Sequence, residues 1–219
     1  MMHPFISTLL SVASGIPVTL TYSLVPLLFG FMLGTVLGLI KVSGPRPTRW
    51  LVNLYVSIFR GTPLLVQLFI VAYGLPLIGF KVSAFMAGIL AFSLNSAAYV
   101  CEIVRAGIES IDKGQYEAAA TLSIPYWMSM KDIILPQAFK RVLPALVSEA
   151  INLVKESAII SVLPIGVADI TRQAQFINQQ SYSFFEPMLA AACCYYLITS
   201  VLNLIGHALE MKLQQGAKS

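Results

Sequence analysis

Charged residues are scarce in this chain. Only 11% of its 219 residues are Asp, Glu, Lys or Arg, whereas 57% are hydrophobic. Soluble domains carry roughly 25% charged residues, since charged side chains keep a water-facing surface hydrated. The scarcity excludes an ordinary soluble enzyme or binding module. It indicates a protein that lies largely within a membrane.

Cysteine is also rare. The chain has three, Cys101, Cys193 and Cys194, and all lie in apolar surroundings. An odd number with one adjacent pair forms no disulfide framework and has no metal-ligand spacing. We therefore expect these residues to act as small apolar packing groups, and we expect the chain to bind no metal or other cofactor.

Catalytic motifs are missing as well. The sequence has no Gly-x-x-x-x-Gly-Lys-Ser/Thr phosphate loop, no His-Glu-x-x-His and no Gly-x-Ser-x-Gly. We expect no enzymatic activity, and no ATP hydrolysis by the chain itself. Its net charge of +4 does not indicate a nucleic-acid partner, because the basic residues cluster between apolar stretches and not along one helix face.

What the chain does have is a series of long apolar stretches. They cover about 16–40, 64–80, 83–104, 142–167 and 187–209. A helix of about 20 apolar residues crosses the hydrocarbon core of a bilayer. The sequence therefore predicts an all-α membrane protein with about five transmembrane helices, forming one domain over 1–219.

Three glycines, Gly30, Gly34 and Gly38, recur every fourth residue in the first stretch. That spacing places them on one helix face, where the missing side chains let a neighbouring helix approach closely.

The basic residues predict the orientation. Eleven Lys and Arg fall on one side of the predicted helices and two, Lys81 and Arg172, on the other. The eleven are Lys41, Arg46, Arg49, Arg60, Arg105, Lys113, Lys131, Lys140, Arg141, Lys212 and Lys218. Because basic loops stay in the cytoplasm, we expect the amino terminus outside, and the carboxyl terminus and loop 105–141 inside.

Loop 105–141 is the longest polar segment between apolar stretches. Glu117, Ala118 and Ala119 favour a helix, and Ser123 with Pro125 predicts its end and the start of a second one. Two short helices in a polar loop suggest a docking device. Glu117 then either offsets the dipole of its own helix in the first turn or contacts a partner. Ser123 either caps the second helix or occupies a position with positive φ.

The run from Glu117-Ala118-Ala119 through Ser123 to Ile133-x-Leu135-Pro136 resembles the EAA loop of the membrane-spanning subunits of type I ABC importers. It departs from the family at Ser123, where the pattern has Gly. Two further runs, Arg60-Gly-Thr-Pro-Leu-Leu-Val-Gln67 and the segment that begins with Asn95, resemble the polar amino-acid branch of these permeases.

The resemblance implies the permease fold, a cytoplasmic two-helix coupling loop and a location in the bacterial cytoplasmic (inner) membrane. It implies cytoplasmic ATPase subunits that hold ATP and Mg²⁺, and a periplasmic or lipid-anchored binding protein that delivers a polar amino acid. A second permease chain, identical or paralogous, completes the path. The ATPase-coupling residues carried over from the motif are Glu117, Ala118, Ala119, Ser123 and Pro136.

The stretch 142–167 contains Glu149, Asn152, Lys155 and Glu156. Charges in hydrocarbon cost a few kcal/mol each, so these side chains should face protein or water. They form either a polar wall of the substrate path or an ion pair or kink that fixes helix register. Asn95 is a further path candidate, although interhelical hydrogen bonding explains it equally well.

A second function class is an ion-coupled secondary transporter in which Lys155 and Glu156 relay protons. Inverted repeats, which many such transporters contain, are not visible in the sequence.

Overall fold

The computed structural model describes residues 4–163 and 168–215, which form helices joined by short links and contain no strand. The helices are α1 (Pro4–Ala13), α2 (Ile16–Ser43), α3 (Arg46–Gly61), α4 (Leu64–Phe69), α5 (Leu75–Leu77), α6 (Ala84–Glu109), α7 (Lys113–Thr121), α8 (Tyr126–Ser129), α9 (Leu135–Glu156), α10 (Ile170–Ser181) and α11 (Phe185–Gln215). π-helical turns at Ile70–Gly74 and Met130–Ile134 join α4 to α5 and α8 to α9, and a 3₁₀ turn covers Ser157–Val162.

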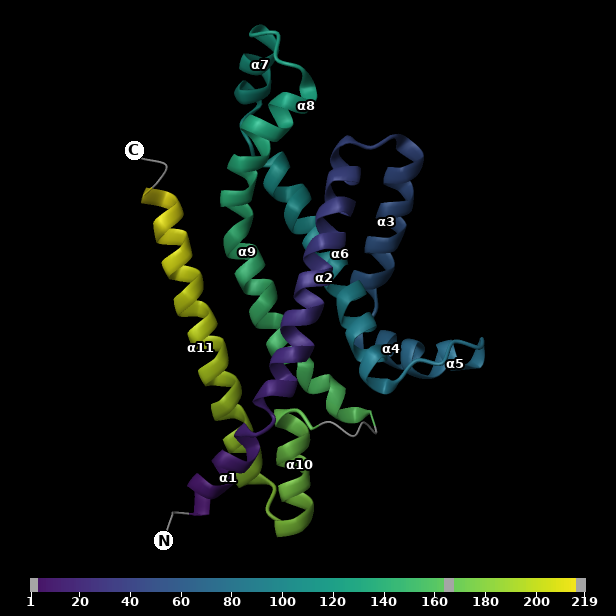
Figure 1. Ribbon diagram of the computed structural model, residues 1–219, viewed down its shortest axis with the longest axis vertical. Helices are drawn as coiled ribbons and strands as arrows, with labels where there is room; N and C mark the ends of the chain where they lie inside the picture. Colours follow the sequence, from purple (N-terminus) through teal and green to yellow (C-terminus); the bar gives the residue numbers. More distant parts are fainter. Residues whose placement is uncertain (1–3, 164–167, 216–219) are drawn as a thin grey trace.

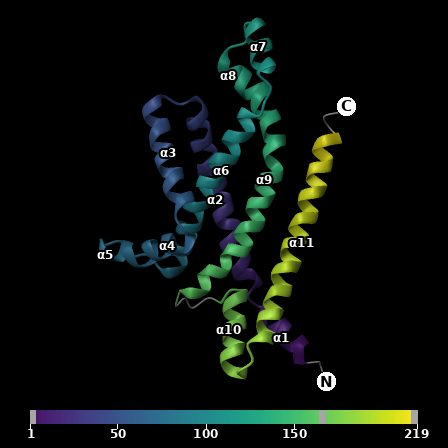
Figure 2. The ribbon, with the colours of Figure 1, turned by 180° about the vertical axis from the view of Figure 1, so that it is seen from behind.

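The long helices form an elongated bundle (Figure 1). Helices α7 and α8 project from one end, which also holds the α2–α3 turn and the end of α11. Helices α1 and α10 lie at the opposite end, and the view from behind gives the same arrangement (Figure 2). The first and last described helices, α1 and α11, therefore begin and end at opposite ends of the bundle.

Helices α2 and α6 pack together along most of their length, and the glycine face of α2 makes this possible. A Cβ atom on Gly34 would lie 2.7 Å from the Ala97 carbonyl oxygen, and one on Gly38 would lie 2.9 Å from Cβ of Val104. Both distances are shorter than any stable packing contact. The predicted close approach of a neighbouring helix is confirmed.

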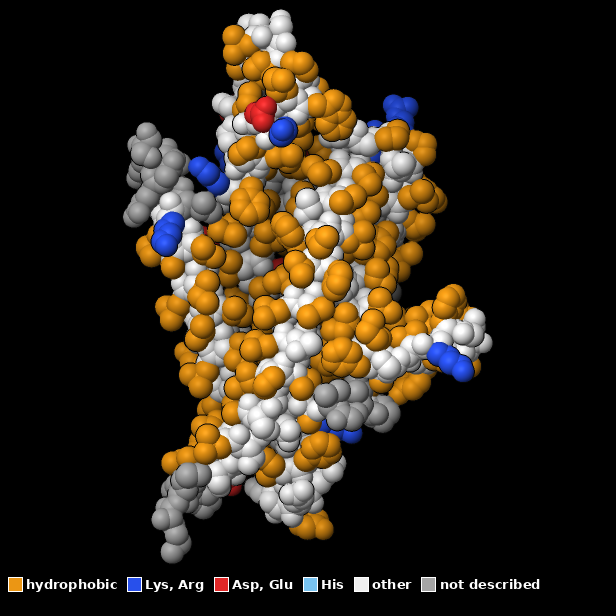
Figure 3. All heavy atoms as spheres, in the orientation of Figure 1, with side chains coloured by type: hydrophobic (Ala, Val, Ile, Leu, Met, Phe, Trp, Pro, Cys, Tyr) orange, Lys and Arg blue, Asp and Glu red, His pale blue; other side chains and the backbone are white. Residues whose placement is uncertain are grey.

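Within the described residues, three segments are long and apolar enough to cross a membrane: Phe5–Ser43, Ala84–Glu109 and Phe185–Lys212. A fourth is present if α3 and the bent segment after it count as one broken span. Exposed apolar side chains cover much of the surface, notably along α2 and α11 (Figure 3). Helix α9 is not among these segments, because every 18-residue stretch of it holds at least three charged residues.

The stretch 64–80 is an interrupted segment, made of α4, a π-helical turn and α5. Helix α3 is the long element of this region, and the segment Leu64–Leu77 turns away from it by 104°. Arg60 lies in the last turn of α3, just before the break at Thr62 and Pro63, and not in a loop.

Two other stretches bear on the bounds of the predicted apolar segments. Between the last two of these segments, Ile170–Ser181 forms helix α10. Asp169 caps that helix by accepting hydrogen bonds from the backbone N–H groups of Thr171 and Arg172 at 3.1 and 3.0 Å. The stretch 142–167 begins inside α9, which ends at Glu156, and its last residues lie outside the described part of the chain.

Candidate functional site

The coupling loop between α6 and α9 contains both predicted short helices. Asp112 caps the start of helix α7, and its carboxylate accepts a hydrogen bond from the N–H of Gly114. It ends where the N–H of Ser123 bonds the carbonyl of Ala120 at 2.9 Å and the N–H of Ile124 bonds that of Ala119 at 3.0 Å. These two bonds form a Schellman motif. Ser123 has φ of 54°, in the left-handed region where this motif usually has glycine.

This geometry bears on two alternatives that the sequence left open. Ser123 does not cap the second helix, because the residue before α8 is Pro125 and no side chain caps it. Of the two roles left open by the sequence, Ser123 has the one with positive φ. Glu117 is the fifth residue of α7 and not part of its first turn, so helix capping does not account for it.

The loop has a buried side and an exposed side. Ala119 is only 3% exposed, whereas Glu117, Ala118, Ser123 and Pro136 are exposed. Glu117 forms no ion pair with a described residue. The tip adds exposed apolar side chains, with Leu122 at 73% and Trp127 at 74% exposure. An exposed carboxylate beside exposed apolar groups is a surface suited to a protein partner.

The buried side connects the loop firmly to the membrane helices. Met130 and Ile134, in the π-helical turn, pack in one cluster with Val104 and Ile108 of α6 and Ala138 of α9.

Polar contacts add to this apolar cluster. Gln137 donates to the side-chain oxygen of Gln115 at 3.1 Å, and Ser43, at the end of α2, shares a 2.8 Å hydrogen bond with Tyr126 of α8. The loop therefore contacts α2, α6 and α9.

The exposed face of helix α9 has few large apolar side chains, unlike the exposed faces of α2 and α11. Its exposed residues are Pro136, Phe139, Lys140, Arg141, Pro144, Ala145, Ser148, Asn152 and Lys155. Phe139, close to the coupling loop, is the one large hydrophobic side chain among them. From Arg141 to Lys155 this face is therefore polar or small.

The four path candidates on α9 divide between interior and surface. Glu149 is only 7% exposed and accepts a hydrogen bond from Ser96 of α6 at 3.0 Å. Glu156 is half-buried, and Asn152 and Lys155 are exposed. Neither Lys155 nor Glu156 forms an ion pair with a described residue, so an ion pair between them does not fix helix register. Glu149, Asn152 and Glu156 thus do not share one environment: Glu149 lies inside the bundle, Asn152 lies on its surface, and Glu156 lies between the two.

Asn95 lies away from this surface, in a polar network at the α3–α4 break. Its amide donates to the side-chain oxygen of Gln67 at 2.9 Å. Gln67 in turn donates to the Phe59 carbonyl at 2.8 Å and to the Thr62 hydroxyl at 2.9 Å. Of the two roles that the sequence left open for Asn95, the structure favours interhelical hydrogen bonding.

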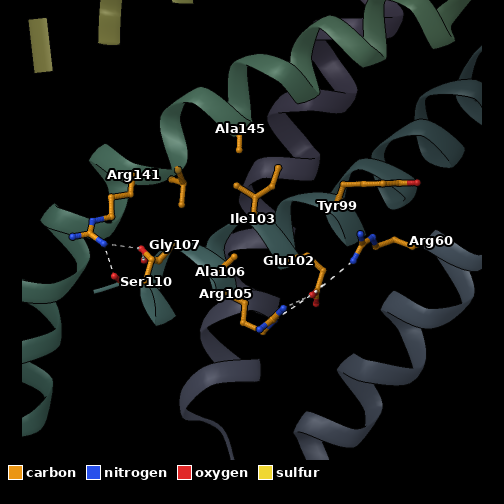
Figure 4. Close-up of a pocket in the computed structure, with 11 residues that line it drawn as sticks. Arg60, Tyr99, Glu102, Ile103, Arg105, Ala106, Gly107, Ser110, Arg141 and Ala145 are labelled. Carbon is orange, nitrogen blue, oxygen red and sulfur yellow. Dashed lines mark hydrogen bonds and ion pairs between the residues drawn. The ribbon is translucent and has the colours of Figure 1, made fainter. Parts of the chain in front are cut away.

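A hollow of about 520 Å³ opens between α3, α6 and α9, beside the part of the polar face near Arg141 and Ala145. Figure 4 shows Arg60 and Arg105 converging on Glu102 at one side of it, with Arg141 on the other. Glu102 pairs with Lys41, with Arg105 at 2.8 Å and with Arg60 at 3.7 Å. The sequence does not bring this cluster together, because Lys41, Arg60 and Glu102 lie on three different helices.

The family model for the inner membrane component of binding-protein-dependent transport systems matches residues 27–215. The chain belongs to this family. It is 50% identical over 210 residues to a putative glutamine transport system permease of Rickettsia felis, covering 95% of each protein. It is 49% identical over 204 residues to the arginine transport system permease of Bacillus subtilis, covering 93% of this chain and 92% of the other.

Solved structures agree with this assignment. An amino acid ABC transporter crystallised with histidines has a chain that superimposes with a TM-score of 0.88 at 40% identity, covering 97% of this chain and all of the other. A methionine ABC transporter in inward-facing conformations shares the fold at a TM-score of 0.79 and 18% identity.

The protein is thus the permease subunit of an amino-acid ABC importer, a multi-pass inner-membrane protein and not an enzyme. Membership in this family implies an ATPase, a substrate-binding protein and a second permease as partners. It also removes the ion-coupled secondary transporter as an alternative. Within the described residues, no group of His, Cys, Asp or Glu could hold a metal ion.

Proposed function

We propose that the polar face of α9 lines the path of a polar amino acid between two permease chains. One observation carries this proposal: from Arg141 to Lys155 the exposed side of α9 has no large apolar side chain, whereas α2 and α11 present many. Lipid-facing helix surfaces are apolar because polar side chains are costly in hydrocarbon. A polar face at membrane depth therefore borders water or another protein.

A second copy of the chain, or a paralogue, would close this path from the other side. The 520 Å³ hollow would form part of its cytoplasmic end, because the hollow lies on the side of the bundle that carries the coupling loop. An external binding protein would deliver the amino acid at the α10 end. The amino terminus is then outside, and the carboxyl terminus and coupling loop are in the cytoplasm.

The exposed side of the coupling loop would dock on the cytoplasmic ATPase, which holds ATP and Mg²⁺. Glu117, Ala118 and Pro136 would contact it directly, while buried Ala119 and the turn at Ser123 would set the angle of α7. The packing of the π-helical turn against α6 and α9 supports this role, since it links the loop directly to the helices that line the path.

Relatives named for arginine and for glutamine transport suggest the substrate class. Glu156 is half-buried at the end of α9 and pairs with no basic side chain among the described residues. A carboxylate in this position would attract an ammonium or guanidinium group. Asn152, one turn before Glu156, would offer a hydrogen-bonding amide to the rest of the zwitterion, and Lys155, the residue next to Glu156, would offer a cation.

The test is Glu156→Gln, which keeps the shape and removes the charge. Uptake of arginine should fall about tenfold more than uptake of glutamine, which corresponds to about 1.4 kcal/mol of lost charge pairing. The measurement is uptake of both amino acids in the same membranes, normalised to assembled complex. Glu186→Gln, at the start of α11, is the matched control and should leave the ratio unchanged. An equal fall for both substrates, or lost assembly, would contradict a binding role.

A further inference from the structure

A second hollow, of about 420 Å³, lies where the end of α2, the start of α3 and the end of α6 meet. It is separate from the polar face of α9 and lies at the end of the bundle that carries the coupling loop (Figure 1). Four basic residues, Lys41, Arg46, Arg49 and Arg105, line it together with Trp50 and Glu109.

The positive charges of this hollow are only partly neutralised. Lys41 pairs with Glu102, and Arg105 pairs with both Glu102 and Glu109. Arg46 and Arg49 form no ion pair with a described residue. The chain therefore holds an excess of two positive charges here, on guanidinium groups whose forked donors match the oxygens of a phosphate.

An apolar strip on α3 adjoins these charges. Trp50 lines the hollow and is 63% exposed, and Leu51, Leu54 and Ile58 follow along the outer side of α3, all exposed. Tryptophan is enriched where a membrane meets water, because its ring is apolar and its N–H is polar. The hollow thus places a cationic pocket at one end of an apolar strip. This arrangement matches a ligand with an anionic head and an apolar tail.

We propose that this hollow binds the phosphodiester headgroup of an anionic phospholipid, whose acyl chains lie along Leu51, Leu54 and Ile58. Arg46 and Arg49 bind the phosphate oxygens, and Trp50 lies at the boundary between headgroup and acyl chains. Basic pockets between transmembrane helices on the cytoplasmic side are suited to such headgroups. The proposal depends on the membrane setting of the family and not on the substrate or on the path along α9.

The experiment uses the permease in complex with its ATPase. The complex is purified in detergent, incubated with phosphatidylcholine containing or lacking phosphatidylglycerol or cardiolipin, and washed, and its bound lipid is measured by native mass spectrometry. The wild type should retain anionic lipid in preference to phosphatidylcholine. Arg46→Gln with Arg49→Gln should lower the apparent affinity roughly 25-fold, because each basic residue near the surface contributes about fivefold.

The matched control is Lys140→Gln with Lys212→Gln, which removes two exposed charges at the same end of the bundle and should retain lipid as the wild type does. An unchanged melting temperature and elution volume show that the arginine variant is folded. Equal lipid retention in that variant and the wild type would overturn the proposal. The proposal would also fail if the bound phosphorus remained in the aqueous phase on chloroform extraction, because the ligand would then be free phosphate. It would fail too if the arginine variant kept its lipid but lost the ATPase subunits from the complex, because the hollow would then be a protein-docking surface.

Discussion

Ser96 of α6 donates a hydrogen bond to the carboxylate of Glu149 on α9, with 3.0 Å between the two oxygens. The pair lies inside the bundle, and both residues are buried. A Cβ atom on Gly30 of α2 would come within 2.7 Å of the Ser96 hydroxyl, so three helices meet at this point. The acidic residue that looked from the sequence like part of a path wall therefore joins helices together.

Removing this hydrogen bond should destabilise the permease without changing its selectivity. Ser96→Ala leaves a buried carboxylate without its donor, which costs about 1.5–3 kcal/mol. Ser148→Ala is the control, because Ser148 is exposed and bonds only the carbonyl of its own helix, and it should stay within about 0.5 kcal/mol of wild type. Thermal unfolding of the purified complex measures both. A changed ratio of arginine to glutamine uptake in Ser96→Ala would contradict a purely structural role.

The turn at Ser123 should gain stability from glycine. Ser123 has φ of 54° at the end of α7, a conformation that costs non-glycine residues about 1–2 kcal/mol. Ser123→Gly should therefore raise the stability of the coupling loop by about 1 kcal/mol. Thr121→Gly, two residues earlier and still helical, should lower it by a similar amount. Hydrogen exchange of the α7 amides in the purified complex should be slower in Ser123→Gly and faster in Thr121→Gly than in the wild type. A change in the same direction in both variants would refute backbone strain at Ser123.

Glu117 should govern the association with the ATPase. Glu117→Lys replaces an exposed carboxylate with a cation at the proposed contact and should weaken ATPase binding about tenfold or more. Glu210→Lys, at the end of α11, is the control and should bind normally. Co-purification of the ATPase with membrane-inserted permease measures the effect, together with uptake per ATP hydrolysed. Unchanged coupling in Glu117→Lys would remove Glu117 from the contact.

The orientation should follow from cysteine labelling in a chain whose native cysteines are replaced by alanine. Ser181→Cys, at the end of α10, should react with a membrane-impermeant maleimide in cells with a permeable outer membrane. Thr121→Cys, in the coupling loop, should react only after the inner membrane is opened. Both residues are exposed, so access to the thiol limits neither reaction. The reverse pattern would invert the proposed topology.

Much of the architecture is readable from local pattern. The uncharged stretch 16–40 predicts the first long helix, and the four-residue spacing of Gly30, Gly34 and Gly38 predicts the close contact with α6. The apolar composition of 64–80 does not show that, across the break at Thr62 and Pro63, this segment turns away from α3 by 104°. The network of Gln67 and Asn95 holds that break, and its two residues are 28 positions apart.

The sequence by itself determined the membrane class, the coupling loop and the family, because these depend on hydropathy and on motifs formed by neighbouring residues. Only the tertiary structure decided which polar side chains face inward. Glu149 and Asn152 are a helical turn apart on α9, yet one lies between helices and the other on the surface. The clusters around Glu102 and Arg46 likewise exist only once three helices converge. Helical periodicity gives the angle between two side chains around the helix axis, but packing against neighbouring helices decides which side of the helix is buried.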